Sequence, residues 1–217
     1  MLSTTTFRCF FGALVLVSAA AFAAPAAEGE AGWQKLSRPA DGFAVQLPPG
    51  WKAVDLSAAD FQGSIDKILA GSPELVAAFG DQLPAMAASG VKLFAVDVKT
   101  DFTKVGFATN LNVLIDTVSP QIRLEDYLEA NRRQLEALEI VDKPLKWKKI
   151  ELGQHPAGFF EYRMLLDPKT GSKVAITQVF AISPKGALVF TFTTLPQLTG
   201  EYRRVFADMI ERLQILE

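Results

Sequence analysis

The stretch that decides the fold is residues 145–194, LKWKKIELGQHPAGFFEYRMLLDPKTGSKVAITQVFAISPKGALVFTFTT. It contains four runs with the composition of strands, Leu145–Leu152, Ala157–Leu166, Val174–Ile182 and Ala187–Thr194. Short segments with glycine and proline separate the runs, and such segments form tight turns. Because a short turn joins strands that run in opposite directions, this stretch predicts an antiparallel meander.

Outward from the meander, the sequence predicts two more strands and two long helices. Alternation with a period of two marks strands at Val91–Val98 and Leu111–Thr117. Apolar residues at helical spacing mark amphipathic helices over Leu124–Glu139 and from about Gly200 to Gln214. Two such helices on one sheet predict an α+β fold, with an antiparallel β-sheet flanked by amphipathic helices in an α/β/α sandwich.

The residues before these elements predict a hairpin and then a helical insertion. Phe43–Leu47 alternates, Pro48-Pro49-Gly50 turns the chain, and Trp51–Asp55 follows as a second strand. Capping residues and helical spacing over residues 57–90 predict an inserted pair of short helices. We therefore expect residues 33–217 to form a single domain that carries this insertion.

Residues 1–23 have the pattern of a secretory signal peptide. The apolar run Phe10–Phe22 ends at the cleavage-type sequence Ala21-Phe22-Ala23. We expect cleavage there, export to the periplasm or the extracellular space, a flexible mature N-terminus over residues 24–32, and no stable membrane anchor after cleavage. An uncleaved anchor is the alternative, but the run is mostly alanine and small residues crowd its end. The single cysteine, Cys9, would leave with the signal peptide.

The overall composition limits the classes of partner. The chain has 22 Lys and Arg residues against 24 Asp and Glu residues, a formal net charge of −2. This mild acidity argues against a nucleic-acid partner, because nucleic-acid binding requires a basic surface. Hydrophobic residues make up 49% of the chain, which is enough for a substantial core.

Two segments carry a resemblance to a known family. The segment Gly42–Trp51, and the segment Ala187–Thr194 before an aromatic C-terminal helix, resemble the PsbP-like superfamily. That superfamily includes the photosystem extrinsic protein PsbP, a eukaryotic Ran-binding release factor and DcrB-like bacterial envelope proteins. The resemblance covers Gly42 to Leu216, and residues 57–90 depart from the shorter members. It implies an α/β/α sandwich whose members mostly bind partners or assist assembly without catalysing a reaction.

The chemistry-bearing side chains favour neither an enzyme nor a metal or cofactor site. His155 is the only histidine, and its place before Pro156 indicates an exposed turn residue. Asp97, Asp101 and Asp116 could form an acid/base pair or a Ca²⁺ site. They fall on different strands and loops without the spacing of an EF-hand, so we interpret them as solvated strand ends. The sequence contains no nucleophile-elbow, Walker or dinucleotide-binding motif.

A basic cluster surrounds a tryptophan at the start of the meander. Lys143, Lys146, Lys148 and Lys149 lie close to Trp147 in the sequence. Basic residues interleaved with an aromatic residue can bind phosphates or a polyanion. Lysines also protect edge strands against aggregation, and the weak field of four charges on an acidic protein favours this second interpretation.

Asn110 and Asn112 are unusual residues for a strand. They alternate with Leu111 and Val113, so both should point to the same face of the sheet. Either they line a cleft as a pair of fixed polar groups, or the beginning of the strand is exposed to solvent.

The inserted segment supplies an apolar stripe made of Leu75, Val76, Phe79 and Leu83. Gly80 and Pro84 weaken this helix intrinsically, so it must dock on something. Either part of the stripe is a recognition surface, or the stripe caps the open end of the sandwich as core. The candidate binding surface thus comprises this stripe with Asn110 and Asn112.

These observations lead to three functional hypotheses. The preferred one is an exported, non-enzymatic module that binds or assembles a protein or envelope component. The second is a carrier of a small apolar ligand, held in a cavity between the sheet and the insertion. The third is a hydrolase with an unrecognised site, and the scarcity of catalytic residues disfavours it.

Overall fold

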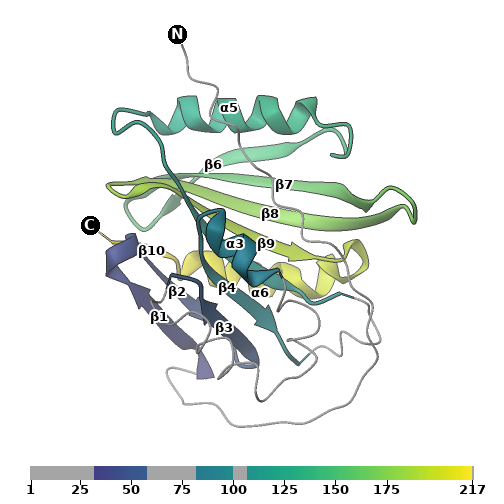
Figure 1. Ribbon diagram of the computed structural model, residues 1–217, viewed down its shortest axis with the longest axis horizontal. Helices are drawn as coiled ribbons and strands as arrows, with labels where there is room; N and C mark the ends of the chain where they lie inside the picture. The colour runs from purple at the N-terminus through teal and green to yellow at the C-terminus, as the bar shows by residue number, and fades with distance from the viewer. Residues whose placement is uncertain (1–31, 58–81, 100–106, 217) are drawn as a thin grey trace.

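A computed structural model describes residues 32–57, 82–99 and 107–216 of the chain (Figure 1). The expected signal peptide, nearly all of the expected flexible N-terminus and most of the expected helical insertion lie outside these residues. No helix among the described residues is long and apolar enough to cross a membrane.

The described residues form ten strands and three α-helices. In chain order the elements are β1 (Gln34–Arg38), β2 (Phe43–Leu47), β3 (Trp51–Asp55), α3 (Leu83–Ala88), β4 (Val91–Asp97), β5 (Asn110–Asp116), α5 (Leu124–Ala137), β6 (Lys146–Leu152), β7 (His155–Asp167), β8 (Ser172–Ser183), β9 (Gly186–Thr194), α6 (Thr199–Glu211) and β10 (Gln214–Ile215).

Seven strands form the main sheet in the order β3-β4-β5-β9-β8-β7-β6, and every neighbouring pair is antiparallel. The last four strands are the predicted meander, joined by tight turns. The strands and the two long helices begin and end within a few residues of their predicted bounds. The fold class, an α+β fold built on an antiparallel sheet with flanking helices, is therefore confirmed.

The predicted hairpin of residues 43–55 is wrong. β2 does not pair with β3; it lies at the centre of a second sheet of order β1-β2-β10. β3 instead pairs with β4, with Trp51 opposite Asp97. The backbone N–H of Trp51 donates to the carbonyl of Pro48 at 3.2 Å, which closes a turn that leads the chain from one sheet to the other. The turn was predicted correctly, and the sheet that each strand joins was not.

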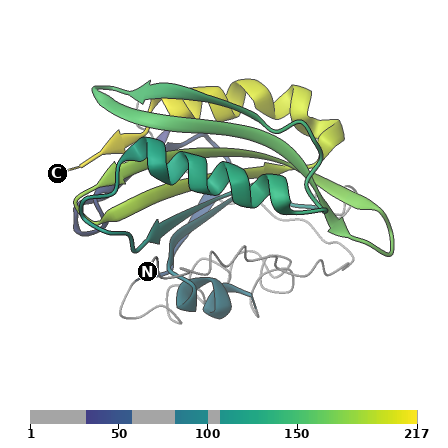
Figure 2. The same ribbon diagram turned by 90° about the horizontal axis from the view of Figure 1, so that it is seen from above.

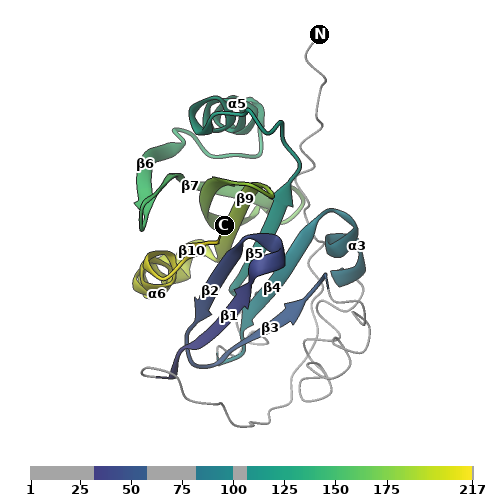
Figure 3. The ribbon, with the colours of Figure 1, turned by 90° about the vertical axis from the view of Figure 1, so that its left-hand side faces the viewer.

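The main sheet has a different cover on each face (Figures 2 and 3). We call the face under α5 and α3 the α5 face, and the opposite face, under α6 and the small sheet, the α6 face. On the α6 face, Phe43 of β2 meets Phe190 of β9 edge-on with a centroid distance of 5.8 Å. Phe206 of α6 packs against Phe192 of β9 with ring centroids 5.1 Å apart. These aromatic contacts join the two sheets and α6 in one core.

α5 rests on the other face over β7 and β8. Its buried side chains include Tyr127, Leu128 and Leu135, which pack with Phe160 and Phe180 of the sheet. Its charged residues lie on the side away from the sheet, as its amphipathic sequence predicts. α3 packs on β4, so the two helices cover separate regions of the α5 face.

Candidate functional site

Leu83 is the one residue of the predicted apolar stripe that lies among the described residues. Leu83 is 1% exposed and packs in a cluster with Val54 and Phe94 of the sheet. For Leu83 the core alternative is therefore correct, and this side chain forms no part of an exposed recognition surface. Leu75, Val76 and Phe79 lie outside the described residues, and their role stays a prediction.

Pro84 does not interrupt a helix as the sequence suggested. It stands in the first turn of α3, directly after Leu83, where its missing N–H leaves no helical hydrogen bond unmade. The proline thus favours the start of this helix.

Asn110 and Asn112 lie on the α5 face of β5, as the alternation predicts. Asn112 stands between Phe94 of β4 and Thr191 of β9, and Thr191 stands beside Gln178 of β8. We call Asn112, Thr191 and Gln178 the polar row. The row crosses the α5 face between β4, which α3 covers, and β7, which α5 covers.

The hydrogen bonds of these polar residues stay within the protein. Tyr162 donates to Oε1 of Gln178 at 2.9 Å, and Nε2 of Gln178 donates to Oγ1 of Thr191 at 3.0 Å. Asn110 is 9% exposed and donates to the carbonyl of Ala108 at 2.9 Å, so a solvent-exposed start of the strand is wrong for Asn110. In the described part of the chain, every buried side-chain nitrogen and oxygen has a hydrogen-bond partner. This internal bonding supports a structural role for Gln178, Thr191 and Asn110.

Two of the three aspartates interpreted as solvated strand ends, Asp97 and Asp116, are at least half-buried. Asp97 is 7% exposed, and it accepts hydrogen bonds from the hydroxyl of Tyr202 and the backbone N–H of Lys99. Asp116 is half-buried and accepts a hydrogen bond from the hydroxyl of Tyr127 at 3.1 Å. Burial raises the pKa of Asp116, and the bond from Tyr127 offsets this only in part. Asp101 lies outside the described residues.

These enclosed carboxylates belong to separate structural networks. The described residues contain no group of three or more His, Cys, Asp or Glu side chains that could hold a metal ion. His155 is half-buried at the first position of β7, after the Gly153-Gln154 turn, and is less exposed than predicted.

The most unusual surface of the described chain is the outer edge of the main sheet. β6 ends the sheet and pairs only with β7 among the described strands. Its residue Trp147 is 46% exposed and is the one large hydrophobic side chain classed as exposed among the described residues. We define the lysine–tryptophan edge as Lys146, Trp147, Lys148 and Lys149 of β6 with the preceding Lys143, all of which are exposed.

The two sides of this edge differ in chemistry. Trp147 and Lys149 point to the α5 face, where the Trp147 ring meets Phe160 edge-on at 6.1 Å and Lys149 pairs with Glu125 at 2.9 Å. Lys146 and Lys148 point to the α6 face. Nζ of Lys148 lies 5.0 Å from the centre of the Phe159 ring. Among the described residues, no salt bridge neutralises Lys143, Lys146 or Lys148.

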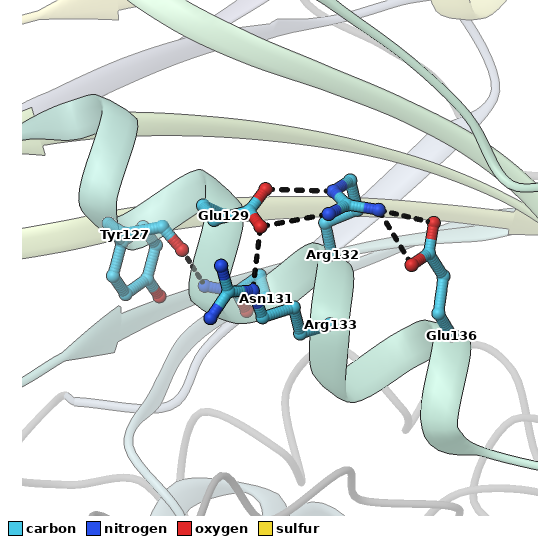
Figure 4. A network of polar contacts seen from close by, with 6 residues as sticks. All are labelled: Tyr127, Glu129, Asn131, Arg132, Arg133 and Glu136. Carbon is cyan, nitrogen blue, oxygen red and sulfur yellow. Dashed lines mark hydrogen bonds and ion pairs between the residues drawn. The ribbon is translucent and has the colours of Figure 1, made fainter.

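The neighbouring helix carries charges of a different kind (Figure 4). On α5, Arg132 bonds Glu129 and Glu136, and Arg133 also bonds Glu129 at 2.6 Å. Hydrogen bonds from the two arginines lower the pKa of Glu129 to about 2. Asn131 donates inward to the carbonyl of Tyr127 at 2.8 Å. Both arginines of α5 are thus paired within the helix, whereas three of the lysines at the lysine–tryptophan edge have no salt bridge among the described residues.

The register of β6 shows which backbone groups point outward. Glu151 stands opposite Pro156, and a proline has no N–H to share in a mutual hydrogen-bonded pair. Hydrogen-bonded and non-hydrogen-bonded pairs alternate along an antiparallel ladder. Lys149 and Trp147, two and four positions before Glu151, are therefore also in non-hydrogen-bonded pairs. Their N–H and C=O groups point away from β7, toward the open edge.

Sequence reasoning identified the lysines and the tryptophan but favoured a protective role for them. The exposure of Trp147 and the position of β6 at the end of the sheet depend on strand order, which the local pattern does not contain. The signal that could have marked this surface is the tryptophan itself, because lysines suffice to protect an edge.

A solved structure of another protein has a fold similar to that of this chain. The solution structure of cyanobacterial PsbP (CyanoP) from Synechocystis sp. PCC 6803 matches with a TM-score of 0.56 and 15% sequence identity, over 89% of this chain and 98% of the other. The fold is PsbP-like. This agrees with the resemblance seen in the sequence, and at this identity the likeness concerns the fold alone.

Two other structures match less closely. LpqN of Mycobacterium tuberculosis, involved in cell envelope biogenesis, matches with a TM-score of 0.48 and 12% identity over 81% of this chain and 83% of the other. PA94 of Pseudomonas aeruginosa, a protein of unknown function, matches with a TM-score of 0.43 and 13% identity over 82% and 94%. No protein-family model and no curated protein matches the chain.

Proposed function

We propose that this chain is an exported, non-enzymatic binding or assembly module, and that it contacts a protein or envelope component through the lysine–tryptophan edge. The observation that carries the proposal is the exposure of Trp147 on an end strand that also presents lysines on both faces. Tryptophan is among the residues that contribute most to protein interfaces, and it is seldom left in water at the end of a sheet.

Several features support this function over the others. The chain has one histidine and one cysteine, and the enclosed aspartates Asp97 and Asp116 accept hydrogen bonds from tyrosines inside the structure. The signal-peptide pattern of the sequence supports export. The PsbP-like fold agrees with a binding role in general.

The carrier and hydrolase hypotheses stay predictions. Most of the insertion that would close a ligand cavity lies outside the described residues. Where α3 meets the sheet, the described contact is a packed cluster of Val54, Leu56, Leu83 and Phe94. We therefore place the binding surface at the opposite end of the sheet, on β6.

Site-specific photocrosslinking in the native envelope tests the proposal. A photoreactive phenylalanine analogue would replace Lys146 on the edge or, as a control, Lys169 in the turn between β7 and β8, where the side chain is also exposed. We expect a discrete adduct from position 146 that is lost with Trp147→Ser, and none from position 169. Absence of an adduct at 146, or equal adducts at both positions, would overturn the proposed surface.

A further inference from the structure

We propose that the lysine–tryptophan edge binds an extended, acidic polypeptide segment, which adds to the main sheet as an eighth strand beside β6. This inference rests on the proposed binding function and specifies the chemistry and conformation of the partner. It draws on three independent features of β6: its outward backbone groups, its charge and its tryptophan.

The backbone of β6 offers the hydrogen bonds that an added strand needs. The N–H and C=O groups of Trp147 and Lys149 point away from β7, as the register opposite Pro156 requires. A chain lying alongside β6 can pair with both residues in the ladder pattern. The seven residues of β6 set the length of the segment that the edge can hold.

The side chains of β6 predict the pattern of the added strand. A residue opposite Trp147 would lie on the α5 face, where an apolar side chain can cover the indole ring. Its two neighbours would lie on the α6 face beside Lys146 and Lys148, where acidic side chains are favoured. Glu161 already stands opposite Lys146 on the inner side, so a carboxylate suits this position. The matching partner therefore alternates acidic and apolar residues.

A second copy of this chain does not meet these requirements. Pairing of β6 with the same strand of another molecule would bring the lysines of both copies together. Like charges directly opposite each other across a ladder are destabilising. The edge thus disfavours self-association and favours a partner of opposite charge.

A membrane surface also fits less well than a polypeptide. Insertion of β6 into lipid would remove water from its outward backbone groups without supplying hydrogen bonds. The neighbouring helix presents Glu125 and Asp126 in its first turn, and both are exposed. These carboxylates repel an anionic lipid surface, whereas an extended peptide along β6 need not cover them.

A titration with defined peptides tests the proposal. The probe is a blocked seven-residue peptide that alternates Glu and Val, added to the mature protein and followed by NMR. We expect chemical-shift changes centred on β6, and slower hydrogen exchange at the amides of Trp147 and Lys149. A control peptide with the same residues in two blocks, VVVEEEE, keeps the charge but lacks the alternation, and should bind at least fivefold more weakly. Equal binding of the two peptides would overturn strand addition.

Two variants at one position test the backbone bond. Lys149→Ala removes the charge and the Glu125 pair but keeps the outward N–H, whereas Lys149→Pro removes that N–H as well. Proline is tolerated at an edge position whose N–H faces solvent, so both variants should fold. We expect Lys149→Pro to bind the alternating peptide at least fivefold more weakly than Lys149→Ala. If the two variants bind alike, the peptide does not pair with this residue and the proposal is wrong.

Charge reversal tests the chemistry of the partner. Lys146→Glu should weaken binding of the Glu/Val peptide roughly two- to tenfold and strengthen binding of a Lys/Val peptide, because the cross-strand pair changes sign. Lys169→Glu makes the same change of net charge in the β7–β8 turn and should alter neither. Equal effects of the two reversals would mean that overall charge, rather than this edge, attracts the peptide.

The crosslinking and peptide-binding results together distinguish failure of strand addition from failure of the proposed binding function. Specific crosslinks at position 146 without binding of the alternating peptide would retain a binding function but overturn the acidic strand. Binding to phosphatidylglycerol vesicles in place of the peptide would overturn it in favour of a lipid surface. Loss of both crosslinks and peptide binding would overturn the two together.

Discussion

Replacement of Gly158 by alanine tests how α5 is seated on the sheet. A Cβ atom at position 158 would lie 2.2 Å from Cδ2 and 2.7 Å from Cδ1 of Leu128. Real Cβ atoms essentially never approach a neighbour closer than 3.0 Å, so Leu128 or the whole helix must move by about 0.8 Å or more. Leu128 is 2% exposed and cannot swing into solvent. The absence of a side chain at 158 is thus what lets α5 approach β7.

The expected loss of stability follows from two opposing terms. Forcing an extra methyl group into a packed core costs about 1–3 kcal/mol. Alanine in a strand gains roughly 0.5–1 kcal/mol over glycine, because the unfolded chain has less freedom to lose. The central values of the two ranges predict that Gly158→Ala lowers the free energy of unfolding by about 1 kcal/mol, and their extremes allow up to about 2.5 kcal/mol. For a chain of this size, the melting temperature should fall by about 2–8 °C.

Urea unfolding of a double-mutant cycle provides the assay. Leu128→Ala alone should cost about 2–5 kcal/mol, and less in the Gly158→Ala background, where the new methyl group partly fills the cavity. Gly200→Ala is the control, since a Cβ at that position of α6 would meet no atom within 4 Å beyond its chain neighbours and the helix's own backbone. It should leave stability unchanged or raise it by up to about 1 kcal/mol. A Gly158→Ala protein as stable as the wild type, with additive effects in the cycle, would refute the contact between Leu128 and Gly158.

Three further predictions concern charges and the edge. Arg38→Ala should cost about 1–2 kcal/mol at pH 7, because Arg38 pairs with Asp41 and Asp55. Burial alone would raise the pKa of Asp55, but hydrogen bonds from Arg38 and Ser57 outweigh it and lower the pKa. Its contribution is therefore present above about pH 4 and lost as the pH falls further, so urea midpoints of variant and wild type should converge in acid. Asp116→Asn should act in the opposite sense. Because burial raises the pKa of Asp116, the wild type loses stability as the pH rises above about 4. The urea midpoint of the variant should therefore exceed that of the wild type at pH 7 but not at pH 3.5. Finally, hydrogen exchange by NMR should be faster at the amide of Trp147 than at that of Lys148, and equal rates would contradict the inferred direction of the backbone groups.

The sequence predicted the parts of the fold that local patterns determine. The meander from Leu145 to Thr194 has alternating strands and turn residues at each connection, so each strand pairs with its neighbour in the chain. The long helices carry apolar stripes that match their buried faces. In these segments the hydrophobic period, the turn chemistry and the tertiary structure agree.

The sequence failed where pairing depends on distant residues. Alternation identified Phe43–Leu47 as a strand, but it cannot reveal that β1 and β10 flank it. β1 is short and mostly exposed, and β10 has only two residues, so neither shows a clear period. The enclosure of Asp97 was equally hidden, because its partner Tyr202 lies 105 residues away in the chain.

In the candidate site, too, local patterns were predicted correctly and contacts between distant strands were not. The spacing of Asn110 and Asn112 correctly placed both on one face, but the residues beside Asn112 in the polar row, Thr191 and Gln178, come from strands far along the chain. The lysines around Trp147 were evident in the sequence, whereas their position on an end strand depends on the order of all seven strands.

The binding free energies that Trp147 and the lysines can contribute predict which variant of the edge weakens peptide binding most. A tryptophan can bury up to about 250 Å², so the 46% exposure of Trp147 leaves roughly 115 Å² in water. At about 25 cal/mol per Å², complete cover by a partner would be worth about 3 kcal/mol. An exposed lysine–carboxylate pair contributes about 1 kcal/mol at most. Trp147→Ala should therefore weaken binding of the Glu/Val peptide more than removal of any one lysine charge. The opposite order of effects in NMR titrations would mean that the edge attracts charge alone, as a site for a polyanion would, and does not hold an ordered strand.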